Sequence, residues 1–240
     1  MKTLSPLLES VSQNGFAIVR GLLDLEQVEE LIVALSENEG GDRLRRRGEV
    51  FAVRNLLDAS AEIRALANYP SIREIVQEVL GENAIPVRGI LFDKTPGANW
   101  KVPWHQDVTI AVARRVEVEG YGPWSIKAGV LHVQPPACVL EGMLSIRVHL
   151  DDSDWENGAL KVIQGSHLAG RIPEDEASRL GSEGAITVCE VKAGDALLMR
   201  PLLLHASSPA ASPRHRRVIH VDYAAEELPA GMGWAFRASL

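Results

Sequence analysis

The sequence has little cysteine. Among its 240 residues only Cys138 and Cys189 are cysteines, and both lie in apolar surroundings. Small domains held together by disulfides carry more cysteines at shorter spacings, so a disulfide framework is excluded. We expect both thiols to be small core residues, and a reducing, cytoplasmic setting is the default expectation.

Long hydrophobic runs are also missing. A membrane helix needs about 18 apolar residues in a row, and no run reaches that length. At the N-terminus, Glu9 and Gln13 interrupt the apolar residues too early for a signal-peptide core. With 46% hydrophobic and 24% charged residues, the composition is that of a soluble globular protein, which we expect to be intracellular and not membrane-bound.

Positive charge is scarce. The formal net charge is −7, whereas a surface that binds nucleic acid needs an excess of Lys and Arg to neutralise phosphates. The one basic run, RLRRR at 43–47, is short and lacks interleaved aromatic residues, so we expect a solvated loop or a local salt-bridge partner there. Nucleic acid is therefore not an expected partner.

Helical signals fill much of the first third of the chain. Apolar residues at helical spacing predict helices over 24–37 and 70–81, and FAIVRG at 16–21 is typical of one early strand. Asp24 and Gln27 have the spacing of a capping box, which places the start of the first helix.

From residue 84 onward the pattern changes to short apolar or alternating runs separated by Gly, Pro, Asn and Asp. Strands at such spacing without intervening helices favour an antiparallel sandwich or jelly roll. We expect a single domain over 1–240, in which 1–82 is a mostly helical cover and 83–240 is the jelly-roll core.

A candidate metal site begins in the stretch VPWHQDVTI at 102–110. Side chains alternate in an extended strand, so His105 and Asp107 point the same way while Gln106 points the other way. This pair is a weak signal alone, because a strand histidine hydrogen-bonded to a carboxylate has the same pattern. Non-haem iron in a facial triad takes two histidines and one carboxylate, so a third ligand must come from elsewhere.

His205 stands out among the remaining histidines because it ends the apolar strand DALLMRPLLLH and leads into a turn of small residues, where sites are often found. Eleven residues later Arg216 begins another apolar strand, and an arginine that enters a β-core needs an anion to meet. The other histidines have no partner at ligand spacing: His132, His149, His167, His215 and His220.

Together these residues resemble the phytanoyl-CoA dioxygenase family of Fe(II)/2-oxoglutarate-dependent oxygenases. The family pattern is His-X-Asp, a long interval, a distal His and an Arg eleven residues beyond it, matched here by His105, Asp107, His205 and Arg216. Three further stretches resemble the family in order along the chain: GFAIVRGLLDLEQVEEL near the N-terminus, FDKTPG at 92–97 and WENGALKVIQGSH at 155–167.

The resemblance implies a mainly β fold with flanking helices, a cupin-like double-stranded β-helix. It implies that His105, Asp107 and His205 are the catalytic iron ligands and that Arg216 pairs with the distal carboxylate of 2-oxoglutarate. The activity expected with Fe(II), 2-oxoglutarate and O2 is hydroxylation of an unactivated C–H bond of a small molecule, with release of succinate and CO2. A carboxylate at Asp107 favours hydroxylation over halogenation, since family members that chlorinate have a small residue there.

Further contacts are expected with alternatives left open. Gln134, Arg147 and Ser207 are candidates for binding the cosubstrate, against an ordinary polar, salt-bridge or turn-forming role. Candidates for binding substrate, against a role as surface charge or core packing, are Arg54, Lys94, Trp104 and Trp124.

The segment 108–129 is longer than a hairpin needs and holds several glycines and aromatic residues, which suggests a lid over the substrate. Two other classes remain open: a non-catalytic metal-binding jelly-roll protein, and a zinc-dependent hydrolase of cupin-like fold that uses the same three ligands. The chain is expected to act as a monomer or homodimer.

Overall fold

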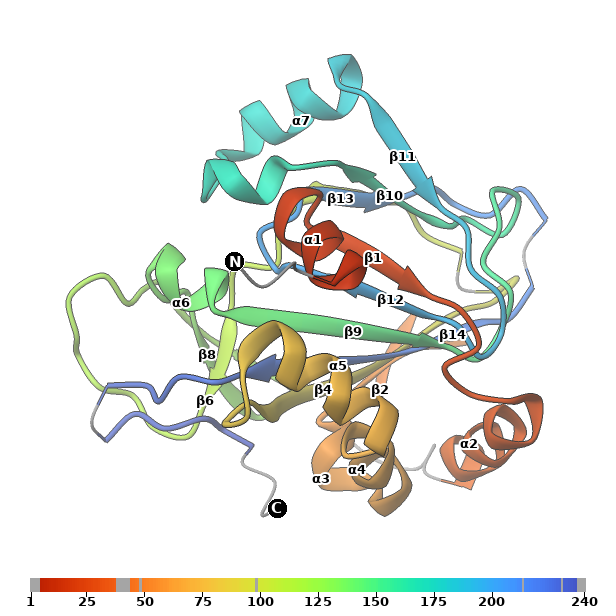
Figure 1. The fold of residues 1–240 in the computed structure, drawn as a ribbon, viewed down its shortest axis with the longest axis horizontal. Helices are drawn as coiled ribbons and strands as arrows, with labels where there is room; N and C mark the ends of the chain where they lie inside the picture. Colours follow the sequence, from red (N-terminus) through yellow and green to blue (C-terminus); the bar gives the residue numbers. More distant parts are fainter. Residues whose placement is uncertain are drawn as a thin grey trace.

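The structure is built on an antiparallel sheet of seven strands (Figure 1). It is a computed structural model that describes residues 5–37, 44–47, 49–97, 99–212, 214–229 and 231–236. The strands of this sheet, in spatial order, are β1 (Phe16–Val19), β12 (Ala196–Met199), β9 (Met143–His149), β14 (Arg216–Ala224), β4 (Ile85–Lys94), β3 (Glu49–Arg54) and β2 (Leu44–Arg47).

Two smaller antiparallel sheets accompany it. The four-stranded sheet contains, in order, β11 (Ile186–Cys189), β10 (Leu160–Ile163), β13 (His205–Ser207) and β5 (Val102–His105). The three-stranded sheet contains β6 (Ile110–Val112), β8 (Val130–Val133) and β7 (Trp124–Lys127). The mainly β, antiparallel character predicted from the sequence is confirmed.

Helices cover the outer face of the seven-stranded sheet (Figure 1). They are α1 (Pro6–Gln13), α2 (Leu25–Glu37), α3 (Leu56–Ala59), α4 (Ala61–Ala67) and α5 (Pro70–Leu80). Their apolar residues form one core with strand residues such as Ile146, Val148 and Ile219. The remaining helical elements are α6 (Ala137–Glu141), the 3-10 helix η1 (Ser166–Ala169) and α7 (Glu174–Glu183).

The two long helices of the first third begin where the sequence predicts. The backbone N–H of Gln27 donates to Asp24 Oδ1 at 2.9 Å, and the backbone N–H of Asp24 donates to Gln27 Oε1 at 3.0 Å, which is the reciprocal capping box. Helix α5 starts at Pro70 and ends before Gly81, whose φ of 92° suits glycine.

The first third also contributes more strand than its sequence pattern predicts. Strand β1 pairs with β12 at one edge of the seven-stranded sheet, while β3 pairs with β4 near the other edge. Residues 44–47 form the edge strand β2 instead of the predicted solvated loop, because β3 folds back beside them; Arg43 lies outside the described residues. An edge strand of four residues is too short to show a clear hydrophobic alternation in the sequence, so it is hard to predict.

The inner face of the seven-stranded sheet is polar along β9 and β14, whereas along β12 Leu197 and Met199 pack on Leu160 and Val162 of the four-stranded sheet. Alternation along β14 puts Arg216, His220 and Asp222 on this inner face, and the register sets His220 opposite Arg147 of β9. Phe92 of β4 lines the same cavity as Arg147 and Arg216. The inner face therefore turns a row of charged and aromatic side chains toward the four-stranded sheet.

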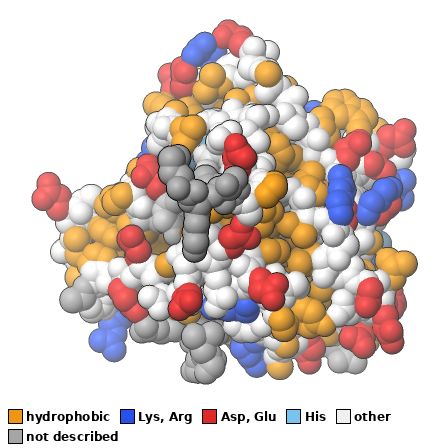
Figure 2. Space-filling view, viewed as in Figure 1, with side chains coloured by type: hydrophobic (Ala, Val, Ile, Leu, Met, Phe, Trp, Pro, Cys, Tyr) orange, Lys and Arg blue, Asp and Glu red, His pale blue; other side chains and the backbone are white. Residues whose placement is uncertain are grey.

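On the face drawn in Figure 2, acidic side chains are scattered among apolar and neutral ones, in keeping with the net charge of −7. Among the described residues, no helix is both long enough and apolar enough to cross a bilayer.

Candidate metal centre

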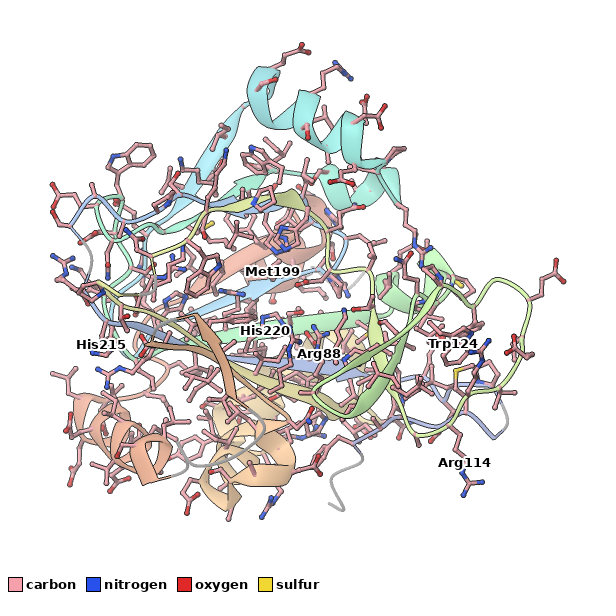
Figure 3. The ribbon with its side chains drawn as sticks, turned by 180° about the vertical axis from the view of Figure 1, so that it is seen from behind. Arg88, Arg114, Trp124, Met199, His215 and His220 are labelled. Atoms are coloured by element: carbon pink, nitrogen blue, oxygen red, sulfur yellow. The ribbon has the colours of Figure 1, made fainter. Side chains whose placement is uncertain are left out.

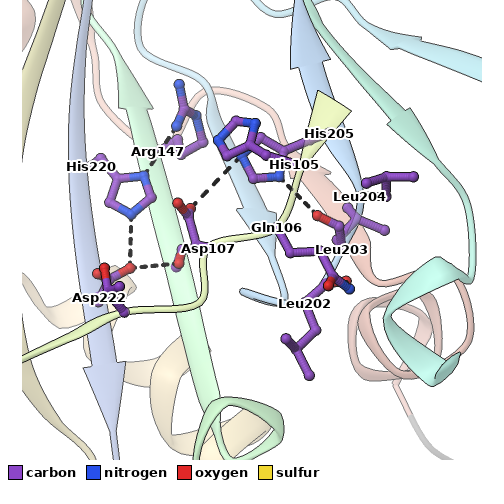
Figure 4. Close-up of polar contacts among 12 residues, drawn as sticks. His105, Gln106, Asp107, Arg147, Leu202, Leu203, Leu204, His205, His220 and Asp222 are labelled. Carbon is purple, nitrogen blue, oxygen red and sulfur yellow. Dashed lines mark hydrogen bonds and ion pairs between the residues drawn. The ribbon is translucent and has the colours of Figure 1, made fainter. Parts of the chain in front are cut away.

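Three side chains with metal-binding atoms meet between the two larger sheets. His105 ends β5 and His205 begins β13, and the antiparallel register sets them directly opposite each other, with ring centroids 4.2 Å apart. Asp107 follows β5, and its Oδ2 lies 3.8 Å from His205 Nε2 (Figure 4). One ligand atom from each residue lies within 4.8 Å of the others, so a single ion can reach all three.

Backbone hydrogen bonds orient both imidazole rings. His105 Nδ1 lies 2.9 Å from the carbonyl oxygen of Pro103, and His205 Nδ1 lies 2.8 Å from that of Leu203. A carbonyl can only accept, so each Nδ1 carries the proton and each Nε2 carries a lone pair. This is the outer hydrogen bond that fixes the tautomer of a metal-ligating histidine.

Gln106 anchors the segment directly after β5, between the two ligands of the His-X-Asp motif. Its Nε2 donates to the carbonyl oxygens of Leu202 and Gly170 at 2.6 and 2.8 Å, and its Oε1 accepts the backbone N–H of Ile172 at 2.8 Å. Gln106 therefore points away from the metal-binding atoms, as predicted, and connects the segment after β5 to two neighbouring loops.

The charges at the site suit a cation. Burial opposes ionisation of Asp107, but the nearby His205, His105, His220 and Arg88 outweigh it and hold the pKa of Asp107 at about 2. Burial and then His105 lower the pKa of His205 to about 3. Near neutral pH the group thus offers one carboxylate and a neutral, buried imidazole, the protonation states that metal binding requires.

A cavity next to these ligands is lined by both sheets. Besides the three ligands, its walls include Phe92, Arg147 and Arg216 from the large sheet and Leu160 and Ser207 from the small one. The cavity therefore joins a candidate metal centre to two arginines.

Arg216 is buried at the start of β14. Its Nη1 donates to the carbonyl oxygen of Gly158, while its Nε has no hydrogen-bond partner. Burial, followed by repulsion from Arg147, lowers the pKa of Arg216 to about 9. An anion that enters the cavity would stabilise this guanidinium, because it would offset both the burial of the charge and the repulsion from Arg147.

Lys94 lies behind Ser207 at the same end. Lys94 is only 1% exposed, and its Nζ donates to Ser207 Oγ and to the carbonyl oxygen of Ser208, both at 3.0 Å. Burial, then Arg216 and Arg147, lowers the pKa of Lys94 to about 7. Lys94, expected as a substrate contact, thus supports the Ser207 side of the cavity.

Arg147 lines the cavity and is held by a chain of buried polar contacts (Figure 4). Its Nη1 lies 3.1 Å from His220 Nδ1, and His220 Nε2 lies 2.8 Å from Asp222 Oδ1. Asp222 also accepts Ser145 Oγ–H at 2.6 Å and Arg88 Nε–H at 2.6 Å. His220 must therefore donate from Nε2 to the carboxylate, and its Nδ1 accepts from Arg147.

Five predicted contact residues are not among those that line the cavity: Lys94, Trp104, Trp124, Gln134 and Arg54. Trp104 packs on α7 at Gly181, where an added Cβ would stand 2.0 Å from the Trp104 ring. Trp124 lies to the side of Arg88 and His220 in Figure 3, with the Arg115 guanidinium 5.3 Å from its ring.

The other two are Gln134, whose backbone pairs with Gly122 and Pro123, and Arg54, which lies opposite Ile90 at the end of β3.

Sequence reasoning missed the chain formed by His220, Asp222 and Arg88. The available signal was alternation along RRVIHVDY, which sets Arg216, His220 and Asp222 on one face. Their partners on β4 and β9 become visible only with the strand register.

The chain belongs to the phytanoyl-CoA dioxygenase (PhyH) family, whose model matches residues 11–218. No curated protein sequence gives a significant match.

Solved structures confirm the cupin-like jelly-roll fold. The non-heme alpha-ketoglutarate-dependent carbocyclase SnoK from nogalamycin biosynthesis is 17% identical with a TM-score of 0.72, and the match covers 93% of this chain and 84% of SnoK. EctD from S. alaskensis with 2-oxoglutarate and 5-hydroxyectoine is 19% identical with a TM-score of 0.71, over 92% of this chain and 76% of EctD. HygX from Streptomyces hygroscopicus with iron bound is 20% identical with a TM-score of 0.66, over 92% and 86%. The cofactors expected from the sequence are bound in two of these neighbours, 2-oxoglutarate in EctD and iron in HygX.

Proposed function

We propose that this protein is an Fe(II)- and 2-oxoglutarate-dependent dioxygenase that hydroxylates an unactivated C–H bond of a small-molecule substrate. The observation that carries the proposal is the convergence of His105, Asp107 and His205 within 4.8 Å, beside a cavity with a buried arginine. Two histidines and one carboxylate leave coordination positions open for a cosubstrate and for oxygen.

The residues around the cavity fit 2-oxoglutarate. The Nε of Arg216 is buried and lacks a partner, and Ser207 lines the same cavity from the four-stranded sheet, where it accepts a hydrogen bond from Lys94. A carboxylate satisfies such donors with charge-assisted hydrogen bonds. We assign Arg216 and Ser207 to the distal carboxylate, and we assign Arg147 to the cosubstrate as the second arginine of the cavity.

Iron and 2-oxoglutarate, when bound with O2, supply the oxidising chemistry and yield succinate and CO2. The protein would hold the metal and the cosubstrate, orient them and shield the site from water. The carbonyl oxygens of Pro103 and Leu203 orient both imidazole rings, and Gln106 fixes the segment between His105 and Asp107. Phe92 and Leu160 present apolar walls that limit water near the reacting carbon.

The buried arginines separate this proposal from its alternatives. A zinc hydrolase with the same ligands has no use for two guanidinium groups aimed at the cavity, and a non-catalytic metal protein has no use for a cosubstrate site. Asp107 supports hydroxylation over halogenation because its carboxylate takes the position that a halide would need.

A succinate-release screen across a metabolite library tests the proposal. We expect one class of small molecule to stimulate succinate formation and to gain one oxygen atom, as judged by mass spectrometry. The His205→Ala variant is the matched control and should show neither signal. A product that loses two hydrogens without gaining oxygen would replace hydroxylation with ring formation or desaturation, and hydrolysis without succinate would favour the zinc enzyme.

We further propose that residues 1–240 form one domain. Strands β1 and β3, from the first 82 residues, pair in the same sheet as β12 and β4 from the jelly-roll region. Because the two parts share that sheet, separating them would remove its edge strands.

A further inference from the structure

His149 is a buried histidine that the proposed mechanism does not use. It ends β9, lies two residues after Arg147 and is 3% exposed. The register sets it opposite Val218, which is two residues after Arg216. His149 is not among the residues that line the cavity, but alternation puts it on the same inner face as Arg147 and Arg216, which do.

Neither ring nitrogen of His149 has a hydrogen-bond partner. The Nε atoms of Arg147 and Arg216 are also buried without partners, so this one face holds four of the eight such side-chain nitrogen and oxygen atoms among the described residues. Buried polar groups are nearly always paired, and each unpaired one costs stability. Such a concentration indicates donors and acceptors arranged for a ligand.

The charge around His149 specifies the ligand's sign. Burial, reinforced by Arg147 and Arg216, drives the pKa of His149 well below its ordinary value. The ring is therefore neutral, with one N–H to donate and one lone pair. An anion with several acceptor oxygens can satisfy this N–H together with the neighbouring guanidinium groups.

We propose that His149 donates its N–H to the distal carboxylate of 2-oxoglutarate, next to Arg216, and so helps to select a dicarboxylate cosubstrate. This inference rests on the proposed function, because that function supplies the dicarboxylate. His149 is a binding residue for the end of the cosubstrate that lies away from the metal ligands.

The test compares two ligands that differ at that end. N-oxalylglycine has a metal-chelating end and a distal carboxylate, whereas oxalate has only the chelating end. Binding of each to the Mn(II)-loaded protein is measured by calorimetry for wild type and for His149→Leu. Loss of one charge-assisted hydrogen bond should weaken N-oxalylglycine binding roughly ten- to a hundredfold and leave oxalate binding unchanged.

Two variants sharpen the comparison. His149→Gln keeps an N–H donor and should recover most of the affinity for N-oxalylglycine. Ser71→Ala removes another unpaired buried atom, on α5 outside the cavity, and should leave both affinities at the wild-type value. If His149→Leu fails to fold, His149→Met replaces it in the same comparison, since it also lacks the donor.

The outcomes separate this inference from the proposed function. Unchanged N-oxalylglycine binding in the variant, or an equal loss for both ligands, would overturn the role of His149 while leaving the enzyme assignment intact. If wild type itself binds N-oxalylglycine no better than oxalate, a distal carboxylate site is absent and the proposed function fails with it.

Discussion

The carboxylate of Asp222 connects the members of the buried polar chain that begins at Arg147. It accepts hydrogen bonds from Arg88, Ser145 and His220 at 2.6, 2.6 and 2.8 Å, and its side chain is 6% exposed. In Asp222→Asn the charge disappears and an amide N–H₂ replaces one acceptor, so at least one of these donors loses its partner.

The expected magnitude follows from the burial of Arg88, whose side chain is 12% exposed. Removing one partner of a buried ion pair leaves an uncompensated charge and costs about 3–5 kcal/mol. That is a large part of the roughly 5–15 kcal/mol that stabilises a typical domain. We therefore expect Asp222→Asn to lower the free energy of unfolding by about 3 kcal/mol or more, measured by urea denaturation at neutral pH.

The pH dependence gives a second readout. Burial opposes ionisation of Asp222, but Arg88 and His220 more than offset it and hold its pKa well below the ordinary range. A lowered folded-state pKa contributes stability that is present above the unfolded value, about 4, and is lost as pH falls toward the folded value. The difference between wild type and variant should therefore be constant near neutral pH and shrink in acid.

The control is the surface pair Arg115–Glu117, whose side chains are 59% and 75% exposed. Glu117→Gln should cost at most about 1 kcal/mol, because solvent screens exposed pairs. If Asp222→Asn costs no more than this control, the reasoning about the buried chain is refuted.

Three further predictions concern the ligands, the packing and the lid. His205→Ala should abolish retention of iron, measured by metal analysis after desalting, and wild-type iron content would remove this residue from the ligand set. Gly181→Val should lower the free energy of unfolding by about 1–3 kcal/mol, because its side chain would overlap the Trp104 ring, and an unchanged urea midpoint would contradict that packing. Cleavage by a protease within 113–123, the part of the predicted lid between β6 and β7, should slow when Mn(II), N-oxalylglycine and substrate bind together, and an unchanged rate would remove support for a lid.

The metal-binding residues were predictable mainly through the family resemblance, since alternation along a strand relates only His105 and Asp107 and is a weak signal alone. His205 does not end an apolar strand as expected from the sequence: β12 ends at Met199, and His205 begins β13 after residues 200–204. The polar chain was not predictable in this way, since Arg147, His220 and Arg88 lie on three strands whose register depends on the whole sheet. Buried charged residues of this kind cannot be recognised from the sequence pattern, because a charged residue within an apolar strand is equally typical of an edge salt bridge.

Aromatic residues near the motif show a second limit. Trp104 is adjacent to His105 in sequence, yet the alternation that orients the histidine turns the tryptophan to α7. Neighbours in a strand therefore have different surroundings, and proximity in sequence is a poor guide to what lines a cavity.

The most direct measurement for the central claim is anaerobic absorption spectroscopy of the protein with Fe(II) and 2-oxoglutarate. We predict a weak visible metal-to-ligand charge-transfer band in wild type, which requires the metal and the chelating cosubstrate at one site. The band should be absent in His205→Ala and should need a higher 2-oxoglutarate concentration in Arg216→Met. Fe(II) bound stoichiometrically by wild type without any such band would contradict the account.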